Sequence, residues 1–225
     1  MRGIILDTST ERGVVAIVNE GSILFQVHLP QGLQTAQSLL PKLQEELHRL
    51  NIDLHTLSYV AVGVGPGSYT GIRVAATIAK TLAFACKLPL IGICTLDAFV
   101  PTEEGPFAVV IDAKIGGVYL QKGILTAGKI LITTPPGVFP LTEAIQLLQD
   151  IPLIVTPNAE KIRPKLEVLS PASHWKWEES YPSCKQFADL AEEKMRTGSI
   201  SADLTLLYMR KTQAEIEREK KAKDS

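Results

Sequence analysis

The sequence is poor in several residue types and patterns that mark particular classes of protein. Its three cysteines, Cys86, Cys94 and Cys184, are widely spaced and form no CxxC pair, so we expect neither a disulfide framework nor a zinc site. The 23 Lys and Arg residues against 24 Asp and Glu residues leave a net charge of −1, so the basic excess of a protein that binds nucleic-acid phosphates unaided is missing. No window approaches the roughly 18 consecutive apolar residues of a membrane helix, and the apolar stretch in MRGIILD is too short for a signal peptide. We therefore expect a cytoplasmic protein without a membrane partner.

Residues for metal-dependent and serine-hydrolase chemistry are also lacking. The four histidines, His28, His48, His55 and His174, show neither the HxxxH nor the HExxH spacing of metal ligands. The sequence contains no cluster of Cys and His and no GxSxG nucleophile motif. We therefore expect no metal site and no catalytic residue in this chain.

What the sequence does have is enough apolar residues for a full core and a regular alternation of strand-like and helix-like segments. Apolar residues make up 45% of the 225 residues. Three strand-like runs with a hairpin turn are followed by helix, strand, helix and strand, and a similar cycle begins after the polar stretch PTEEGP at 101–106. This order predicts an α/β fold with two lobes, each with a mixed sheet and flanking helices.

The lobes follow from the predicted elements. We expect strands at 3–7, 13–18, 23–28, 58–64, 88–93, 107–113, 118–125, 129–134 and 152–156, and helices at 36–51, 72–88, 141–149, 158–167 and 183–197. Residues 1–103 are predicted to form the first lobe and 104–210 a smaller second lobe, with the helix at 183–197 packing back on the first. Residues 211–225 are charged with little apolar face, which predicts a solvated tail.

A run of small polar residues, Asp7, Thr8, Ser9 and Thr10, follows the first predicted strand. Hydroxyl and backbone N–H groups after an aspartate at a strand end can surround a phosphate, as in the first phosphate loop of actin, hexokinase and Hsp70-type proteins. The same run is typical of an Asx or ST turn that starts a hairpin. Both interpretations are open from the sequence.

The segment GPGSYTGIR joins the strand at 58–64 to the helix at 72–88. Pro66 followed by Gly67 predicts a type II turn, and Ser68 or Thr70 can cap the helix. The glycines leave bare N–H groups at a helix N-terminus, which favours an anion, and the cation Arg73 in the first turn indicates a carboxylate or phosphate brought by a partner. The lysine of a P-loop and the spacing of a dinucleotide fingerprint are both missing. The residues expected to face a partner or a phosphate are Asp7, Thr8, Ser9, Gly65, Pro66, Gly67, Ser68, Tyr69, Thr70, Gly71 and Arg73.

Two predicted helices carry faces suited to close packing. Small residues recur at helical spacing in the helix at 72–88, and leucines do so in the helix at 36–51. Such faces fit either the core of the chain itself or an interface with another chain, and the sequence favours neither. The candidate interface residues are Leu39, Leu43, Leu47, Ala76, Ala79, Lys80 and Ala83.

The second lobe begins with an aspartate at a strand end, which mirrors the first. Asp112 follows the run FAVVI and is followed by Ala113 and Lys114. Paired aspartates at strand ends flank the nucleotide cleft in the actin/hexokinase architecture, so Asp112 and Lys114 are candidates for a second-lobe cleft. A turn-initiating aspartate is the equally supported alternative.

With these residues in hand, the chain resembles the TsaB (YeaZ) family. The motifs that carry the resemblance are ILDTST, LLPKLQEEL, VGVGPGSYTGIRVA with the following AKTLA, IDAKIGGVYL and LLYMR, and they cover most of the sequence. The chain departs from the family pattern where LLYMR lacks a proline before the Leu-Tyr pair, where Lys114 replaces a more usual arginine, and in its short second lobe.

The resemblance implies an actin/hexokinase/Hsp70-like (ASKHA) fold and a role as a required but non-catalytic subunit in threonylcarbamoyladenosine synthesis on tRNA. It implies that the first two helices contact the catalytic paralogue TsaD, with TsaE as the ATPase and tRNA bound only by the complex. ATP or ADP would lie at the interface with the partner, with no cofactor bound tightly by the chain alone, and a homodimer would form when the partner is missing.

Two other functions are weaker alternatives. The strand-end aspartates also suit a small kinase of the sugar or acetate type, but residues 151–225 contain only Gly198 where such enzymes need a second glycine-rich loop. A metallopeptidase would require ligands that the sequence does not supply.

Overall fold

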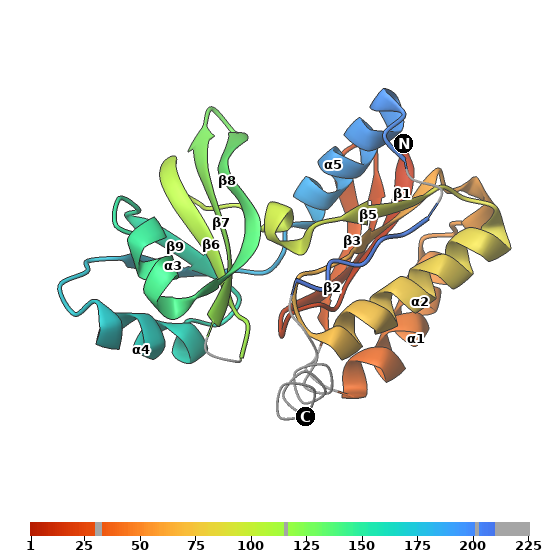
Figure 1. Ribbon diagram of the computed structural model, residues 1–225. Helices are drawn as coiled ribbons and strands as arrows, with labels where there is room; N and C mark the ends of the chain where they lie inside the picture. The colour runs from red at the N-terminus through yellow and green to blue at the C-terminus, as the bar shows by residue number, and fades with distance from the viewer. Residues whose placement is uncertain (30–32, 115–116, 201–202, 210–225) are drawn as a thin grey trace, which may run out of the picture.

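The structure is a computed structural model, and it describes residues 1–29, 33–114, 117–200 and 203–209. Two five-stranded sheets follow one another along the chain and lie side by side, each with helices packed against it (Figure 1). We call these parts the first half and the second half. The tail predicted at 211–225 lies outside the described residues, as does Arg210 of the LLYMR motif.

The two sheets have the same strand order. The first half is ordered β3-β2-β1-β4-β5, and the second, taken from its corresponding end, β8-β7-β6-β9-β10. In each sheet a three-stranded antiparallel meander is extended by two parallel strands, which confirms the predicted α/β fold with a repeated cycle. The strands are β1 (Arg2–Asp7), β2 (Gly13–Asn19), β3 (Ser22–Leu29), β4 (Tyr59–Gly63), β5 (Leu90–Ile93), β6 (Gly105–Asp112), β7 (Gly117–Thr126), β8 (Lys129–Pro140), β9 (Leu153–Thr156) and β10 (Lys176–Glu179). The helices are α1 (Leu33–Arg49), α2 (Tyr69–Cys86), α3 (Leu141–Leu147), α4 (Ala159–Leu169) and α5 (Cys184–Thr197), with short 3-10 helices η1 (Leu54–Thr56) and η2 (Thr95–Ala98).

The sheet of the first half is buried on both faces, which is why its central strands are continuous apolar runs. Ile4 and Leu6 of β1 point to the face covered by α1 and α2, and they share one core cluster with leucines and alanines of those helices. Ile5 points to the opposite face, where Phe187 and Ala188 of α5 pack on it. Helix α5 therefore packs on the first sheet, although it follows the second sheet in the chain (Figure 1).

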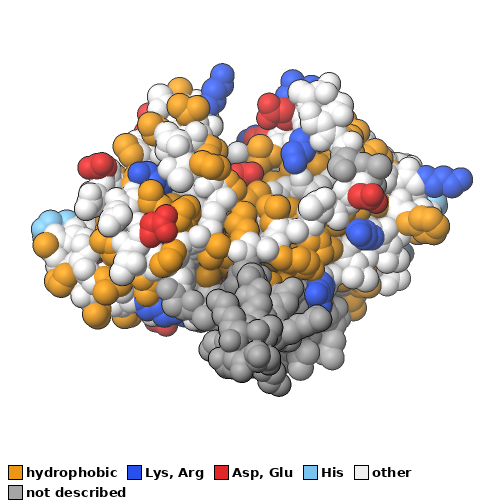
Figure 2. All heavy atoms as spheres, viewed as in Figure 1, with side chains coloured by type: hydrophobic (Ala, Val, Ile, Leu, Met, Phe, Trp, Pro, Cys, Tyr) orange, Lys and Arg blue, Asp and Glu red, His pale blue; other side chains and the backbone are white. Residues whose placement is uncertain are grey.

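The described α-helices of the second half cover one face of its sheet. Val110 and Leu120 pack against α3 and α4, whereas Phe107 and Val109 pack against the connection from the first half, at Leu96 and Phe99. In the surface view the molecule is hollowed at the top between the two halves (Figure 2). The halves thus share a boundary built partly from the chain that links them.

Several features differ from the predicted elements. Strand β8 continues through Pro135 and Pro136 to Pro140, because it lies at the edge of its sheet, where prolines are tolerated. Strand β10, with the polar sequence KWEE, and helix η2 were not predicted. Residues 203–209 were not predicted as part of the core, yet Leu204 and Leu207 pack against the cluster under α1 and α2.

Candidate functional site

The site predicted from the sequence lies at the carboxyl end of β1, and its three polar side chains are buried. Asp7, Thr8 and Ser9 are 0%, 5% and 1% exposed. Oδ1 of Asp7 accepts hydrogen bonds from the Ser9 N–H at 2.7 Å and the Ser9 hydroxyl at 2.6 Å, and Oδ2 accepts from Thr95 at 2.8 Å. The prediction that these side chains face a phosphate or a partner therefore does not fit the structure, because their polar groups are bonded within the chain.

The carboxyl group of Asp7 lies in a ring of hydrogen-bonding oxygens. The hydroxyls of Ser9 and Thr95 also contact each other, at 2.8 Å, so three oxygen–oxygen contacts close a ring with the two carboxyl oxygens. The two hydroxyl protons serve two of these three contacts. Burial raises the pKa of Asp7, and the hydrogen bonds from Ser9 and Thr95 oppose this rise. Burial thus shifts this acid toward its protonated form.

The glycine-rich loop packs directly on this buried run. A Cβ on Gly71 would lie 1.9 Å from the carbonyl oxygen of Thr8, and one on Gly67 would lie 2.1 Å from that of Ser9. The Thr8 hydroxyl donates to the carbonyl of Gly71 at 2.6 Å, and the Ser68 N–H donates to the carbonyl of Ser9 at 2.7 Å. The glycines are required here for close approach between two backbone segments, and the predicted phosphate cradle is filled by the chain itself.

The turn chemistry of the loop was predicted in part. Ser68 is the N-cap of α2 and accepts from the Gly71 N–H, as expected, whereas Thr70 lies inside the helix. The predicted type II turn is wrong, because Gly67 has a φ of 159°, far from the value of about 80° that this turn requires. Gly65 and Pro66 are buried and joined by a cis peptide bond.

The candidate interface faces of α1 and α2 turn out to cover the chain's own sheet. Six of the residues expected at an interface are at most 7% exposed, so in this chain their side chains pack on its own sheet, and their contact with another protein stays a prediction. These buried residues are Leu39, Leu43, Leu47, Ala76, Ala79 and Ala83. Small and apolar side chains at helical spacing let both helices lie close on the sheet. Of the candidates, only Lys80 is exposed.

The outer side of α2 presents a different set of side chains. Arg73, Thr77, Lys80 and Phe84 follow one another at spacings of four, three and four residues, and all are exposed. Phe84 is 88% exposed, more than any other large apolar side chain among the described residues. We call these four residues the outer stripe of α2. On α1, which covers the same face of the sheet, Leu40 is 45% exposed.

Arg73 has a partner within the chain that the sequence did not reveal. Its Nε donates to the Tyr208 hydroxyl at 3.1 Å, and its guanidinium lies 5.6 Å from the centre of the Tyr208 ring. That ring stacks on Tyr69 at 4.8 Å. The Leu207 N–H donates to the carbonyl of Val64 at 2.8 Å, so the segment 203–209 is held along the end of β4. An apolar run near the end of the sequence was the only signal for this contact.

The second-lobe candidates lie in a more open setting. Oδ1 of Asp112 accepts from the Lys114 N–H at 2.9 Å, which is the turn expected as the alternative to a cleft residue. It also pairs with Lys165 of α4 at 2.8 Å, and Lys114 itself is exposed. Asp112 is thus a turn residue with a basic partner, and its side chain is partly accessible.

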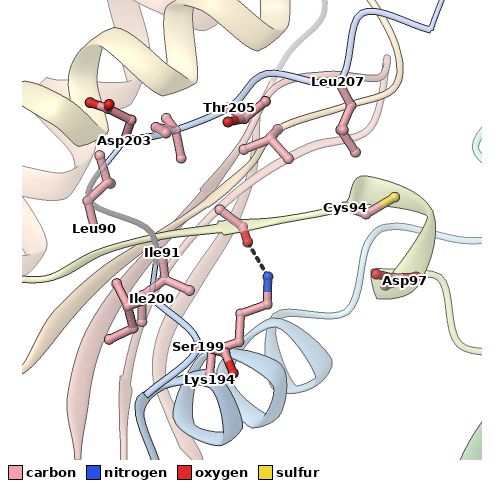
Figure 3. A pocket seen from close by; sticks show the side chains of 13 residues that line it. Leu90, Ile91, Cys94, Asp97, Lys194, Ser199, Ile200, Asp203, Thr205 and Leu207 are labelled. Carbon is pink, nitrogen blue, oxygen red and sulfur yellow. Dashed lines mark hydrogen bonds between the residues drawn. The ribbon is translucent and has the colours of Figure 1, made fainter. Parts of the chain in front are cut away.

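A cavity of about 280 Å³ lies between β5, α5 and residues 199–200 and 203–207 (Figure 3). Lys194 of α5 points into it and donates to the carbonyl of Gly92 at 2.8 Å. Burial raises the pKa of Asp97, and Gln121 and Lys194 lower it in part; burial also raises the pKa of Cys94 to about 12. Within the described ranges, no group of three or more His, Cys, Asp or Glu residues is arranged to hold a metal ion, and no helix is long and apolar enough to span a membrane.

Comparisons with known proteins place the chain in a family. The family model described as TsaD, tRNA N6-adenosine threonylcarbamoyltransferase, matches residues 33–160, more than half of the chain. The chain is 36% identical over 124 residues to the tRNA threonylcarbamoyladenosine biosynthesis protein TsaB of Escherichia coli, and 36% identical over 122 residues to that of Haemophilus influenzae. The chain belongs to the TsaB (YeaZ) family.

The matched region spans about half the length of these curated TsaB proteins, 53% and 51%, and 53% and 52% of this chain. YeaZ from Pseudomonas aeruginosa has the same fold, with a TM-score of 0.73 at 23% identity over 89% of this chain and 96% of that one. The ASKHA fold implied by the sequence motifs is confirmed. The region that matches the TsaD family model extends over both halves of the structure, from α1 to the start of α4.

Proposed function

We propose that the chain is a non-catalytic subunit of the assembly that makes threonylcarbamoyladenosine on tRNA, at the adenosine beside the anticodon, and that it binds and orders a TsaD-type catalytic paralogue. The printed names of its relatives in E. coli and H. influenzae support the pathway. The matching TsaD family model supports a paralogous partner of the same fold. In this proposal a TsaE-type ATPase joins the pair in the cytoplasm, and tRNA is bound only by the complex.

The observation that carries the proposal is the exposed Phe84 in the outer stripe of α2. Its ring is 88% exposed, and burial of such a side chain contributes about 2 kcal/mol. Aromatic residues are enriched among those that dominate binding energy. Lys80 and Arg73 precede it on the same stripe, four and eleven residues earlier in α2, and provide the polar rim that protein interfaces have. The inner faces of α1 and α2 are buried against the sheet, so the outer stripe is the part of α2 that a partner can contact.

The filled site around Asp7 bears on the nucleotide. Because the ring of Asp7, Ser9 and Thr95 is closed and the loop at 65–71 packs beside it, the described residues at the end of β1 leave no open cradle for phosphates. We therefore extend the proposal to nucleotide: ATP or ADP binds at the interface with the partner and not tightly to the isolated chain. Phosphate contacts then come from the assembled pair.

The test is the affinity of the purified chain for a TsaD-type protein, measured by titration calorimetry. We expect Phe84→Ala to weaken binding about 30-fold, because an aromatic anchor contributes about 2 kcal/mol or more. The matched control is Val168→Ala on α4, whose side chain is 77% exposed on a helix of the second half and lies far from the outer stripe in sequence. We expect this variant to bind like the parent chain.

Three outcomes would count against the proposal: no complex even with nucleotide present, an unchanged affinity for Phe84→Ala, or equal weakening by both variants. Sedimentation of the chain alone adds a second readout. We expect a homodimer through the same helices when the partner is missing, and Phe84→Ala shifts this equilibrium toward the monomer.

A further inference from the structure

Two chain segments cross between the halves, and hydrogen bonds and an ion pair hold them in place. The connection that leads into β6 bonds to β10, since the N–H and hydroxyl of Thr102 donate to the Glu178 carboxylate at 3.1 and 2.9 Å. Lys176 pairs with Glu103 in the same place. The other crossing, after β10, is held where the Ser183 N–H donates to the carbonyl of Ala98.

On the other face of β10, side chains of the β1–β2 turn reach across to the second half. Glu178 and Glu179 are neighbours in a strand, so their side chains point to opposite faces. Arg12 pairs with Glu179 and also donates Nε to the carbonyl of Pro157. Beside it, Glu11 pairs with Lys161 of α4 at 2.8 Å. Two ion pairs of opposite polarity therefore link the same turn to the second half, one at the end of β10 and one at the start of α4.

The pair of Arg12 and Glu179 is partly shielded from solvent and is supported by further contacts. The Arg12 side chain is 24% exposed and lies 4.8 Å from the centre of the Tyr181 ring. His28 of β3 stacks on the same Tyr181 ring, with 3.5 Å between the ring centres. The second oxygen of Glu179 accepts from the Ala159 N–H at 2.6 Å, at the start of α4, so this carboxylate is held from both halves.

We propose that Glu11, Arg12, Lys161 and Glu179 form a clasp that holds the two halves closed, on the face of β10 opposite the contact between Glu178 and the first crossing. The crossings are covalent and stay intact when the halves move apart, so they act as a hinge. The clasp consists of ion pairs, which break when the halves open. Salt screens the clasp and shifts the molecule toward the open form. This conformational device is independent of the proposed function, because it concerns the isolated chain.

Hydrogen exchange of the full chain, followed by mass spectrometry, tests the clasp at about 0.05 M and about 0.5 M NaCl. In the parent chain we expect exchange in peptides covering residues 8–12 and 157–161 to accelerate with salt. Glu179→Gln keeps an oxygen for the Ala159 N–H but removes the charge, and we expect it to accelerate exchange there about three- to tenfold at low salt. The salt effect shrinks in this variant. Peptides from α5 serve as the internal reference.

Exchanging the charges of Glu11 and Lys161 distinguishes the loss of the clasp from general damage to the fold. Glu11→Lys places two lysines opposite each other and accelerates exchange, and adding Lys161→Glu restores the attraction and slows exchange again. Arg163→Gln is the matched control, because it removes an ion pair with Glu167 inside α4 that does not cross between the halves. The proposal is overturned if Glu179→Gln exchanges like the parent, if Arg163→Gln has the same effect, or if the double variant fails to restore protection while circular dichroism shows it folded.

Discussion

Asp7 and Asp112 end equivalent strands of two sheets with the same strand order, yet their surroundings differ. Asp7 is fully buried, and every oxygen of its carboxyl group is bonded to Ser9 or Thr95. Asp112 is partly exposed, starts a turn and pairs with Lys165. The difference arises from what lies opposite each strand end: a glycine-rich loop packs on Asp7, and a lysine of a helix faces Asp112.

The comparison teaches that a repeated topology does not repeat the chemistry. In the first half the strand end is a structural joint between β1 and the start of α2. In the second half the corresponding position keeps its charge and some access to solvent. A residue pattern that resembles a phosphate loop can therefore serve close backbone packing, and only the atoms opposite it decide between the two.

The largest effect is expected where the joint is tightest. Gly71→Ala would place a methyl group 1.9 Å from the carbonyl oxygen of Thr8, and backbone on both sides leaves little room to relax. We expect a loss of about 4 kcal/mol in the free energy of unfolding, measured by urea denaturation, or failure to fold. Gly13→Ala is the control near the same aspartate, because its methyl group would lie 3.3 Å from the nearest atom; we expect a change of less than about 1 kcal/mol. Similar losses in both variants would contradict the close-approach explanation.

A smaller effect is expected from the two aspartates themselves. Asp7→Ala leaves a buried N–H and two buried hydroxyls without their acceptor, and we expect it to lower the free energy of unfolding by about 3 kcal/mol. Asp112→Ala removes a turn hydrogen bond and a partly exposed ion pair, for which we expect about 1 kcal/mol or less. Urea denaturation of both variants measures the difference. Equal losses would mean that the two strand ends are energetically alike after all.

The order of elements could be predicted because each depends on local periodicity. Buried strands such as β4 are continuous apolar runs, and α1 repeats its leucines at helical spacing. Strand β10 escaped prediction because KWEE has no apolar alternation, and its pairing with β9 is decided by position in the sheet. The end of β8 was missed because two prolines argue against a strand unless it is known to lie at an edge.

The site was predicted less well, because its contacts join residues far apart in the chain. Thr8 and Gly71 are 63 residues apart, and Arg73 and Tyr208 are 135 apart. Sequence spacing revealed the glycines and the hydroxyl residues but not that they pack on each other. For α2, periodicity identified an apolar face, but that face covers the sheet, and the exposed Phe84 on the opposite side carried no comparable signal.

The smallest expected effect is a pH dependence that separates the two strand ends. Burial raises the pKa of Asp7 above the 3.8 of an exposed aspartate, since three hydrogen bonds offset the burial only in part. Between that value and the raised pKa the folded chain keeps a proton on Asp7 that the unfolded chain has lost. The folded state then binds more protons, so the free energy of unfolding falls as the pH rises through this window.

Asp7→Asn tests this contribution, because its amide does not titrate and its oxygen still accepts from Ser9. The free energy of unfolding of the parent chain and of the variant is measured by urea denaturation at a series of pH values. From pH 4 upward we expect it to fall more steeply in the parent than in the variant. The other titrating groups, Asp97 included, are common to both chains. Asp112→Asn, which removes the carboxyl group at the corresponding strand end of the second half, is measured beside it for comparison. Parallel curves for the parent and Asp7→Asn would show that Asp7 is ionised in the folded chain, and the third contact of its ring, between Ser9 and Thr95, would then lack a proton.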